Sequence, residues 1–321
     1  MMKILANDGL ASDGVNLLES AGFTVVTQKV AQEDLSQAIN NENYEVLLVR
    51  SATQARKELI DLCPGLKLIG RGGVGMDNID VAYAESKGVK VINTPAASSQ
   101  SVAELVFAHL FGICRFLPES NRKMQEQGSI AFGELKKNFS KGIELRGKTI
   151  GIIGFGRIGQ SVASYAFGMG MNVLAYDAYD FNAQIKIVIN GKEITNIDVS
   201  LSSLQDVLAK SDFITVHTPA QADGKALIGE KEINSMKDGA ILINASRGGI
   251  VDEDALLNAL KSGKLRGAGL DVFKNEPTPR KDLLMANHLS LSPHTGAATL
   301  EAQNRVATEL AEQIIATFQP A

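Results

Sequence analysis

The sequence has no tryptophan, only two cysteines and eight prolines among its 321 residues, and no excess of one charge. Cys63 and Cys114 are too few for a disulfide framework, and neither lies in a CxxC pair. A reducing compartment, the cytoplasm, is therefore the simplest interpretation. Lys and Arg number 32 against 36 Asp and Glu, for a net charge of −4. Because nucleic-acid contacts need a basic stripe, the sequence argues against a nucleic-acid partner.

Other classes are excluded by what the chain does not contain. Residues 1–10 lack the charged-then-apolar pattern of a secretory signal. The longest apolar stretch, residues 101–117, carries Glu104, His109 and Arg115, which makes it a poor membrane span. No His, Cys or Asp cluster has the spacing of metal ligands, so we expect no metal. At this length a globular protein of about two domains is expected.

Short apolar runs alternate with amphipathic stretches along the whole chain, which predicts an α/β protein with parallel sheets. We expect strands at residues 3–6, 23–27, 46–49, 66–70, 89–92, 149–153, 172–176, 213–217, 241–244, 267–271 and 289–292. We expect helices at residues 12–21, 35–40, 57–62, 81–87, 101–116, 119–127, 158–167, 201–209, 253–262 and 300–317. Ser12 is a candidate N-cap, and residues 128–146 show no clear period. Residues 185–189 and 192–195 read as an inserted hairpin around Asn190-Gly191.

The segment GFGRIG at residues 154–159 follows an expected strand and opens an expected helix. In this context Gly154 allows a tight turn, Gly156 lets the backbone approach a pyrophosphate, and Gly159 allows close packing of helix on strand. The helix N-terminus offers free N–H groups to phosphates. Asp177 ends the next strand, where an acid binds ribose hydroxyls and disfavours a 2′-phosphate, so NAD is favoured. The alternative is a glycine turn with a solvated aspartate.

Three further strand ends carry an arginine, a glutamate and a histidine. Arg247 follows the strand at 241–244, Glu276 follows that at 267–271, and His294 follows that at 289–292. Since the carboxyl ends of parallel strands line one crevice, these side chains could converge there. Each also has an ordinary explanation, as a surface ion pair, a solvated turn residue and a loop histidine.

At this point the chain resembles the D-2-hydroxyacid dehydrogenase family, and most of all those members that oxidise D-3-phosphoglycerate. The resemblance covers almost the whole chain. It rests on RSAT at 50–53, GRGGVGMDNID at 70–80, NTP at 93–95, GFGRIG at 154–159, HTP at 217–219, RGGIVDE at 247–253, DVFKNEP at 271–277 and PH at 293–294.

The resemblance implies two Rossmann-like domains with the active site between them. Residues 1–96 and 294–321 would form a discontinuous substrate domain, and residues 97–293 a central NAD-binding domain. Arg247 would bind the substrate carboxylate, His294 would exchange the proton of the C2 hydroxyl, and Glu276 would hold His294. Cofactor contacts are implied for Val74, Gly154, Gly156, Arg157, Ile158, Gly159, Asp177, Thr218, Ala245, Ser246, Asp271, Gly296 and Ala297.

A phosphorylated substrate requires cations besides Arg247. Arg50 matches the phosphate-binding arginine of the family, and Gly75 belongs to a turn whose N–H groups could hold the carboxylate. Arg56 and the group Lys136, Lys137 and Lys141 are further cations, although a solvated face is the favoured interpretation of the lysines. The expected reaction is oxidation of D-3-phosphoglycerate to 3-phosphohydroxypyruvate, the first step of serine synthesis.

Alternatives are a hydroxypyruvate or glyoxylate reductase, another D-2-hydroxyacid dehydrogenase such as a D-lactate type, and, less favoured, a non-catalytic NAD-binding corepressor. The family also implies a homodimer, with the helix at 101–117 as a candidate interface, and a small-molecule partner without nucleic acid or membrane. The chain ends at residue 321, where some relatives continue into regulatory domains. We therefore expect activity that is insensitive to serine.

Overall fold

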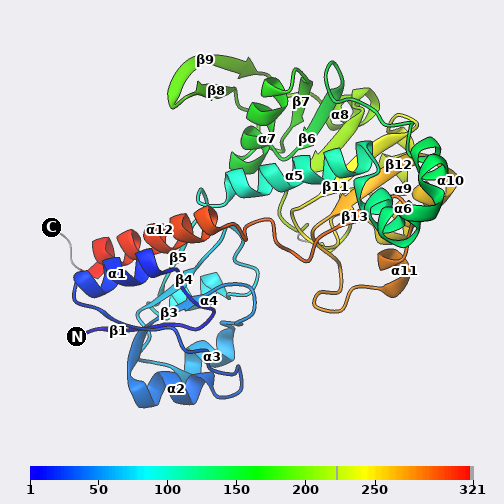
Figure 1. Ribbon diagram of the computed structural model, residues 1–321. Helices are drawn as coiled ribbons and strands as arrows, with labels where there is room; N and C mark the ends of the chain where they lie inside the picture. Colours follow the sequence, from blue (N-terminus) through cyan, green and yellow to red (C-terminus); the bar gives the residue numbers. More distant parts are fainter. Residues whose placement is uncertain (222, 319–321) are drawn as a thin grey trace. The chain divides into compact units, whose positions relative to one another are not determined.

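The computed structural model describes residues 1–221 and 223–318, which form two compact units (Figure 1). The first consists of Met1–Ser99 and the described part of Ala297–Ala321, and the second of Gln100–Gly296. The sequence-based boundaries, after residues 96 and 293, lie three residues from these. The last three residues of the segment expected at 294–321 lie outside the described ones.

The first unit is built on a five-stranded parallel sheet in the order β2-β1-β3-β4-β5. Its strands are β1 (Lys3–Ala6), β2 (Thr24–Val26), β3 (Tyr44–Val49), β4 (Leu68–Arg71) and β5 (Lys90–Asn93). The chain moves from β1 outward to β2 and then returns to the other side of β1. The order therefore reverses between β1 and β3, and loops that follow these strands border the point where such sheets bind ligands.

Helices cover both faces of this sheet. They are α1 (Ser12–Ser20), α2 (Leu35–Glu42), α3 (Lys57–Leu62), α4 (Val81–Ser86) and α12 (Leu300–Phe318). Buried Leu18 of α1 and Leu310 and Ile314 of α12 share one apolar cluster with the sheet. A Cβ on Gly14 would lie 2.6 Å from the carbonyl oxygen of Ala307, so this glycine lets α1 and α12 pack closely.

The second unit is built on a six-stranded parallel sheet in the order β13-β12-β11-β10-β6-β7. Its strands are β6 (Thr149–Ile153), β7 (Asn172–Tyr176), β10 (Phe213–Val216), β11 (Ala240–Asn244), β12 (Leu265–Leu270) and β13 (Leu289–Leu291). The order reverses between β6 and β10. The central strands β10 and β11 are buried throughout, as expected of strands covered on both faces.

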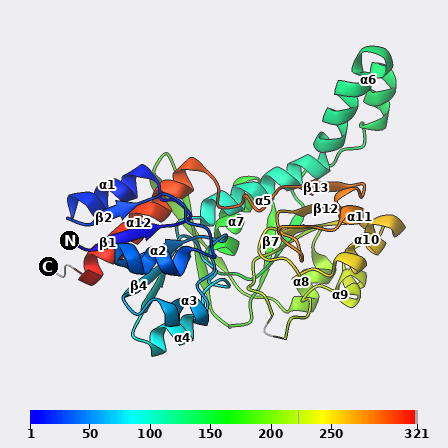
Figure 2. The ribbon, with the colours of Figure 1, turned by 90° about the horizontal axis from the view of Figure 1, so that it is seen from below.

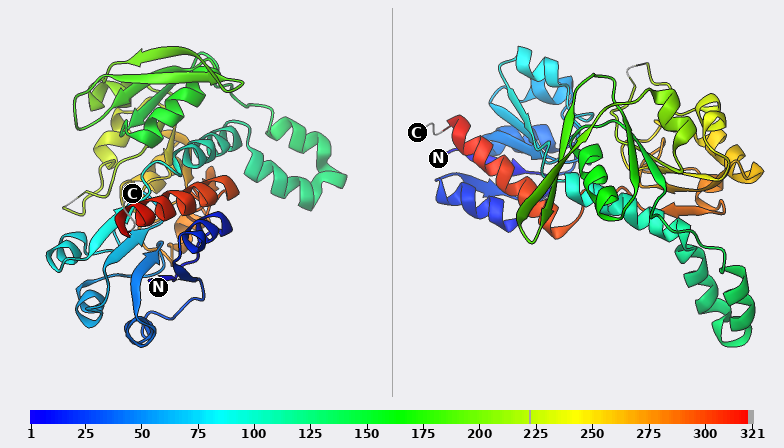
Figure 3. Two further views of the ribbon diagram at one scale, coloured as in Figure 1. Left: turned by 90° about the vertical axis from the view of Figure 1, so that its left-hand side faces the viewer. Right: turned by 90° about the horizontal axis from the view of Figure 1, so that it is seen from above.

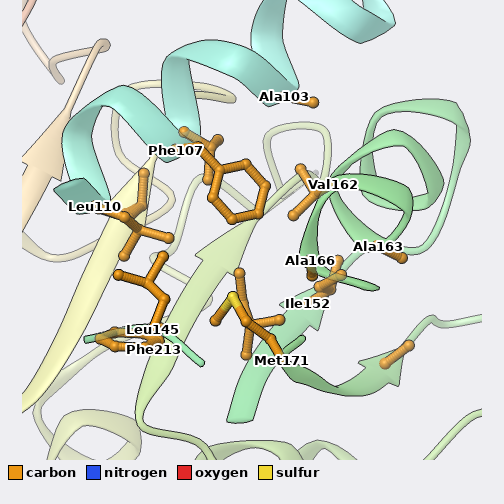
Figure 4. Close-up of a cluster of buried hydrophobic side chains, with 14 of the residues drawn as sticks. Ala103, Phe107, Leu110, Leu145, Ile152, Val162, Ala163, Ala166, Met171 and Phe213 are labelled. Atoms are coloured by element: carbon orange, nitrogen blue, oxygen red, sulfur yellow. The ribbon is translucent and has the colours of Figure 1, made fainter. Parts of the chain in front are cut away.

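The helices of this unit are α5 (Ser99–Cys114), α6 (Leu117–Asn138), α7 (Arg157–Gly168), α8 (Leu204–Lys210), α9 (Glu230–Ser235), α10 (Glu253–Ser262) and α11 (Lys281–Leu284). One apolar cluster joins α5 and α7 to the sheet, and Figure 4 shows Phe107 of α5 beside Val162 of α7, and Leu110 of α5 beside Leu145. A second cluster includes residues of α8, α9 and α10 together with strand residues.

Two elements of the second unit stand apart from its sheet. The strands β8 (Ala183–Ile189) and β9 (Lys192–Val199) pair only with each other among the described strands, as a separate antiparallel hairpin. Helix α6 extends away from the body of its unit (Figures 2 and 3). Only Leu135 on it is buried, whereas Leu117, Ile130 and Phe132 are 62, 85 and 60% exposed.

The structure confirms the α/β fold and corrects several details. Residues 128–138 are also helical and continue α6 across a kink at Ala131, and the short helices α9 and α11 were not expected. Ala11 rather than Ser12 occupies the N-cap of α1, because Ser12 is already helical. Among the described residues no single helix is long and apolar enough to cross a membrane, although the bent pair α5 and α6 passes together by length and composition.

Candidate active site

The glycine-rich loop lies at the point where the six-stranded sheet reverses its order. Gly154 has φ of 92°, and a Cβ there would lie 2.5 Å from the carbonyl oxygen of His217. A Cβ on Gly159 would lie 2.3 Å from the carbonyl oxygen of Gly154. Around Gly156, the N-cap of α7, no atom of the described residues lies within 4 Å of such a Cβ. Two glycines therefore allow tight packing, and the third leaves the helix N-terminus open to a phosphate.

The surroundings of this loop fit a dinucleotide. Asp177, just after β7, accepts a hydrogen bond from the backbone N of Phe155 at 2.7 Å. Arg157 and Ile158 are the first residues of α7, where backbone N–H groups are free of helical partners. The hydroxyl of Thr218, just after β10, is buried and has no hydrogen-bond partner among the described residues. A buried hydroxyl without a partner at a strand end suits a ligand that supplies one.

Arg247 lies on the loop after β11. Ala245 and Ser246 before it are buried, and Ser246 donates through both its backbone N and its hydroxyl to Oδ1 of Asn244. The guanidinium of Arg247 donates from Nη1 to the carbonyl oxygen of Ser246 at 2.7 Å. These bonds fix the stem of the loop before the arginine.

Gly248 brings this loop against the one that follows β12. A Cβ on Gly248 would lie 1.9 Å from the carbonyl oxygen of Phe273. This distance is too short for any side chain, so only glycine fits here. Phe273 in turn donates its backbone N to Oε1 of Glu276 at 2.8 Å. The loop that carries Glu276 therefore packs directly beside Arg247.

Glu276 and His294 form a hydrogen-bonded pair. Nδ1 of His294, after β13, lies 2.7 Å from Oε2 of Glu276. The side chains are 42 and 35% exposed, so a ligand can reach the imidazole. With Nδ1 facing a carboxylate, the proton of the neutral ring lies on Nδ1 and Nε2 is a free base. His294 has a left-handed backbone with φ of 54°, a conformation that is uncommon for residues other than glycine.

Asp271 is the buried centre of the loop around His294. Its side chain accepts hydrogen bonds from the backbone N of Thr295 and of Gly296, both at 2.8 Å. Its carbonyl oxygen accepts from the backbone N of His294 at 2.7 Å. The carboxylate therefore fixes residues 294–296, and Ala297 begins the next segment of the first unit.

A cavity of about 450 Å³ opens beside this pair. His294, Glu276 and Ser292 are its polar lining residues, and Phe273, Leu284 and Leu291 belong to its apolar wall. The size lies within the usual range for small-molecule sites.

Arg50 lies in the first unit at the reversal of its sheet. It follows β3, donates its backbone N to Asp8 at 2.7 Å, and donates from Nη1 to Oε1 of Gln303 at 2.5 Å. Burial lowers the pKa of Arg50, while Asp8 acts in the opposite direction. Because Gln303 is neutral, an anion would be a better partner for this charge.

The remaining expected substrate and cofactor residues lie on loops of the first unit or on helix α6 of the second. Val74 and Gly75 lie in the loop after β4, and the carbonyl oxygen of Val74 accepts a hydrogen bond from the side chain of Asn93 at 2.7 Å. Arg56 is paired with Asp80 at 3.1 Å. Lys136 and Lys137 are exposed on α6 of the second unit.

Sequence reasoning missed several polar partners of the site. Gln303 on α12 lies 253 positions from Arg50, and His109 on α5 lies 183 positions from its partner Ser292. Nothing local in the sequence links such pairs. Alternating strands and helices locate the strand ends but not the helix side chains that reach them.

The fold and these residues define a class of protein. Residues 107–296 match the family described as "D-isomer specific 2-hydroxyacid dehydrogenase, NAD binding domain". The chain belongs to the D-isomer specific 2-hydroxyacid dehydrogenase family, and the match confirms NAD as the cofactor expected from the Gly154 loop and Asp177.

Individual relatives are similar over nearly the whole chain. A D-3-phosphoglycerate dehydrogenase of Methanocaldococcus jannaschii is 41% identical over 314 residues, which are 98% of this chain but 57% of that protein. A hydroxypyruvate reductase of Thermotoga maritima is 39% identical over 97% of both chains. Among solved structures, a glyoxylate reductase from Paecilomyes thermophila has a TM-score of 0.83 at 26% identity, covering 100% of this chain and 96% of that one. A D-lactate dehydrogenase from Aquifex aeolicus, solved with NAD and lactic acid, has a TM-score of 0.74 at 29% identity over 99% and 95%.

Proposed function

We propose that the protein is an NAD-dependent dehydrogenase that oxidises D-3-phosphoglycerate at C2 to 3-phosphohydroxypyruvate, the first step of serine synthesis. The observation that carries this proposal is the contact of 2.7 Å between His294 and Glu276, in the NAD-binding unit of this family and beside the loop of Arg247. An imidazole held by a carboxylate is the group that oxidation of an alcohol needs.

His294 is the proton acceptor in the proposed reaction. When hydride leaves C2, the O–H bond of the C2 hydroxyl must also break, and its proton passes to Nε2 of His294 while C2 and its oxygen form the carbonyl. The ring then carries a positive charge, with Nδ1–H donating to Oε2 of Glu276. The carboxylate stabilises this imidazolium and keeps the free nitrogen directed away from itself. In the reverse reaction, His294 returns this proton to the keto oxygen as the 2-keto acid is reduced.

Arg247 binds the carboxylate of the substrate. Its planar guanidinium forms two parallel hydrogen bonds with a carboxylate, which fixes the plane of the acid and hence the orientation of C2. The Gly154 loop, Arg157, Ile158, Asp177 and Thr218 would hold NAD, which supplies the hydride acceptor when bound. Ala245, Ser246, Asp271, Gly296, Ala297 and Val74 are the further residues we assign to its contacts.

Arg50 binds the phosphate group of the substrate in this proposal, and Gly75 contributes a backbone N–H to the carboxylate. The support is the partly buried guanidinium whose side chain donates to neutral Gln303. Replacing an amide partner by a phosphate strengthens the hydrogen bond, because both groups are then charged. The same interaction would discriminate phosphoglycerate from unphosphorylated acids.

A hydroxypyruvate or glyoxylate reductase is the second candidate. It is favoured by the relative in Thermotoga maritima, which matches over 97% of both chains at an identity close to that of the phosphoglycerate dehydrogenase. The chemistry at C2 would be the same, and only the role of Arg50 would differ.

A substrate panel with an Arg50 variant separates the two candidates. We expect the highest kcat/KM with NAD and D-3-phosphoglycerate, and Arg50→Ala should raise KM for that acid about 10- to 100-fold, the loss of one charged hydrogen-bonded contact. The variant should leave KM for glyoxylate and hydroxypyruvate within about twofold. Arg56→Ala is the matched control, since Arg56 is paired with Asp80. Unchanged use of phosphoglycerate by Arg50→Ala would remove the phosphate assignment.

We further propose that the protein is a cytoplasmic homodimer. Helix α6 exposes Leu117, Ile130 and Phe132, a set of large apolar side chains that association would bury. Sedimentation equilibrium should give twice the mass of one chain, and a monomer at micromolar concentration would contradict the proposal.

A further inference from the structure

His109 is a buried histidine to which the proposed reaction assigns no role. It lies on α5, is 3% exposed and makes two hydrogen bonds. Nδ1 lies 2.8 Å from the hydroxyl of Ser290, and Nε2 lies 3.0 Å from the hydroxyl of Ser292. Ser292 is two residues from His294, so the ring reaches the loop of the catalytic pair from another element.

Two glycines on β12 make this contact possible. A Cβ on Gly269 would lie 2.7 Å from Cβ of His109, and a Cβ on Gly267 would lie 2.6 Å from Cγ2 of Ile113. Gly267 and Gly269 share one face of the strand, and His109 and Ile113 are one helical turn apart. The strand therefore offers a flat surface on which α5 lies close enough to place the ring against residues 290–292.

The hydrogen atoms in this chain of contacts have one consistent arrangement. An ionised Asp271 has no proton to donate, so Ser292 donates its only hydroxyl proton to Oδ1 of Asp271, at 2.6 Å. The hydroxyl oxygen of Ser292 must then accept from Nε2–H of His109. Nδ1 of the neutral ring is left as an acceptor, and Ser290 donates to it. Each group therefore donates a hydrogen bond to the next, in the order Ser290, His109, Ser292, Asp271.

A neutral ring agrees with the burial of this group. Burial lowers the pKa of His109, and the charge of Asp271 opposes the shift. A protonated ring would place a donor on Nδ1 and would force Ser290 to turn its proton elsewhere. The arrangement thus requires the neutral Nε2–H form.

Asp271 transmits this arrangement to His294. Its carboxylate holds the backbone N of Thr295 and of Gly296, and its carbonyl holds that of His294. These bonds support the left-handed backbone of His294, with φ of 54°. If Asp271 turned, the imidazole would lose its alignment with Glu276.

We infer that His109 is a positioning residue for His294. His109 donates to Ser292, Ser292 donates to Asp271, and Asp271 fixes the backbone that carries the imidazole of His294. For its effect on turnover, this inference rests on the proposed role of His294. For the position of the ring, it stands on the contacts alone.

Kinetics with matched variants test the effect on turnover. Ser292→Ala and His109→Leu should lower kcat about tenfold or more, because an ångström of misalignment is costly, with KM for the acid within about twofold. The isotope effect on kcat for a C2-deuterated substrate should rise, since the hydride step becomes limiting. A smaller fraction of folded enzyme would lower both rates equally and would leave the isotope effect, which is their ratio, unchanged. Ser290→Ala removes only the donor to Nδ1 at the far end of the same relay and should lower kcat less than Ser292→Ala does. His109→Gln, whose amide offers N–H donors and a carbonyl acceptor, should recover most of the loss relative to His109→Leu.

Imidazole ¹⁵N spectra test the position of the ring without any turnover. The four histidines can be assigned by single substitution. His109 should show the neutral Nε2–H form at pH 7, and the ring signals of His294 should move in Ser292→Ala and move less in Ser290→Ala. Unmoved His294 signals in Ser292→Ala, or an unchanged isotope effect in an active enzyme, would overturn the inference. If the wild-type protein oxidises no hydroxy acid, but the His294 signals still move in Ser292→Ala, the proposed function is overturned and the positioning role is not.

Discussion

The two sheets of the molecule follow the same topological rule and carry different chemistry. The order of each parallel sheet reverses once, between β1 and β3 in the first unit and between β6 and β10 in the second. Near the first reversal lie Asp8 and Arg50, and at the second lie the Gly154 loop and Thr218. Topology thus predicts where ligands bind, whereas the side chains at the strand ends determine what can happen there.

Titratable groups strengthen the contrast between the units. All four histidines, at positions 109, 217, 288 and 294, belong to the second unit. Proton exchange by an imidazole is therefore confined to that unit, and the first contributes other charges and backbone N–H groups. Three substitutions, with successively smaller effects, would test this division.

Removal of His294, the proposed proton acceptor, should have the largest effect. His294→Asn should lower kcat about 10²- to 10⁴-fold, the usual contribution of a general base. Asparagine is chosen because it tolerates the left-handed backbone at this position. Stopped-flow and steady-state rates measure the loss, and NADH titration by fluorescence is the control, with an unchanged Kd. A kcat within tenfold of the wild type would place proton exchange elsewhere.

Acid should destabilise the second unit before the first. Burial lowers the pKa of His217 to about 3, so between pH 6.5 and pH 3 the unfolded chain binds a proton that the folded one does not. Stability therefore falls as pH drops through this window. At pH 5 this histidine alone should cost about 2 kcal/mol. His217→Asn should remove that part of the pH dependence in urea unfolding at pH 7 and pH 5. Equal pH slopes for both proteins would show that His217 is protonated in the folded state.

The smallest effect concerns packing in the first unit. Gly14→Ala should destabilise the protein by about 1 kcal/mol, since the added methyl meets the backbone of Ala307 and overpacking outweighs the gain in helix propensity. Gly168→Ala in α7 is the matched control, with nothing within 4 Å, and should stabilise by about 0.5 kcal/mol. Thermal unfolding of both variants measures the difference. A stabilised Gly14→Ala protein would mean that α1 and α12 can separate at little cost.

The sequence predicted elements best where an apolar run is sharply bounded. The bounds of β1, β6, β7, α3 and α10 agree with the structure residue for residue. The continuation of α6 to Asn138 was missed because Leu135 is its single buried residue. A helix without a buried face has no apolar period to read. Helices α9 and α11 are too short to show one.

The site was predictable to the extent that it lies in contiguous motifs. Arg247, Glu276 and His294 each follow a strand that the apolar pattern locates, and the structure pairs the last two. The partners that the sequence did not reveal come from helices far away in the chain: His109 bonds Ser292, two residues before His294, and Gln303 accepts from Arg50. Their roles depend on which helix face meets which strand end, and that is set by packing at residues such as Gly269.

The hairpin of β8 and β9 has a practical consequence. Its turn residues Asn190 and Gly191 both have positive φ, of 51° and 72°, as a tight two-residue connection requires. Its ladder joins neither large sheet. Lengthening this ribbon by residue pairs would leave the register of the six-stranded sheet unchanged. A fluorescent or affinity tag grafted at this turn would therefore report on the enzyme without disturbing the strands that carry its chemistry.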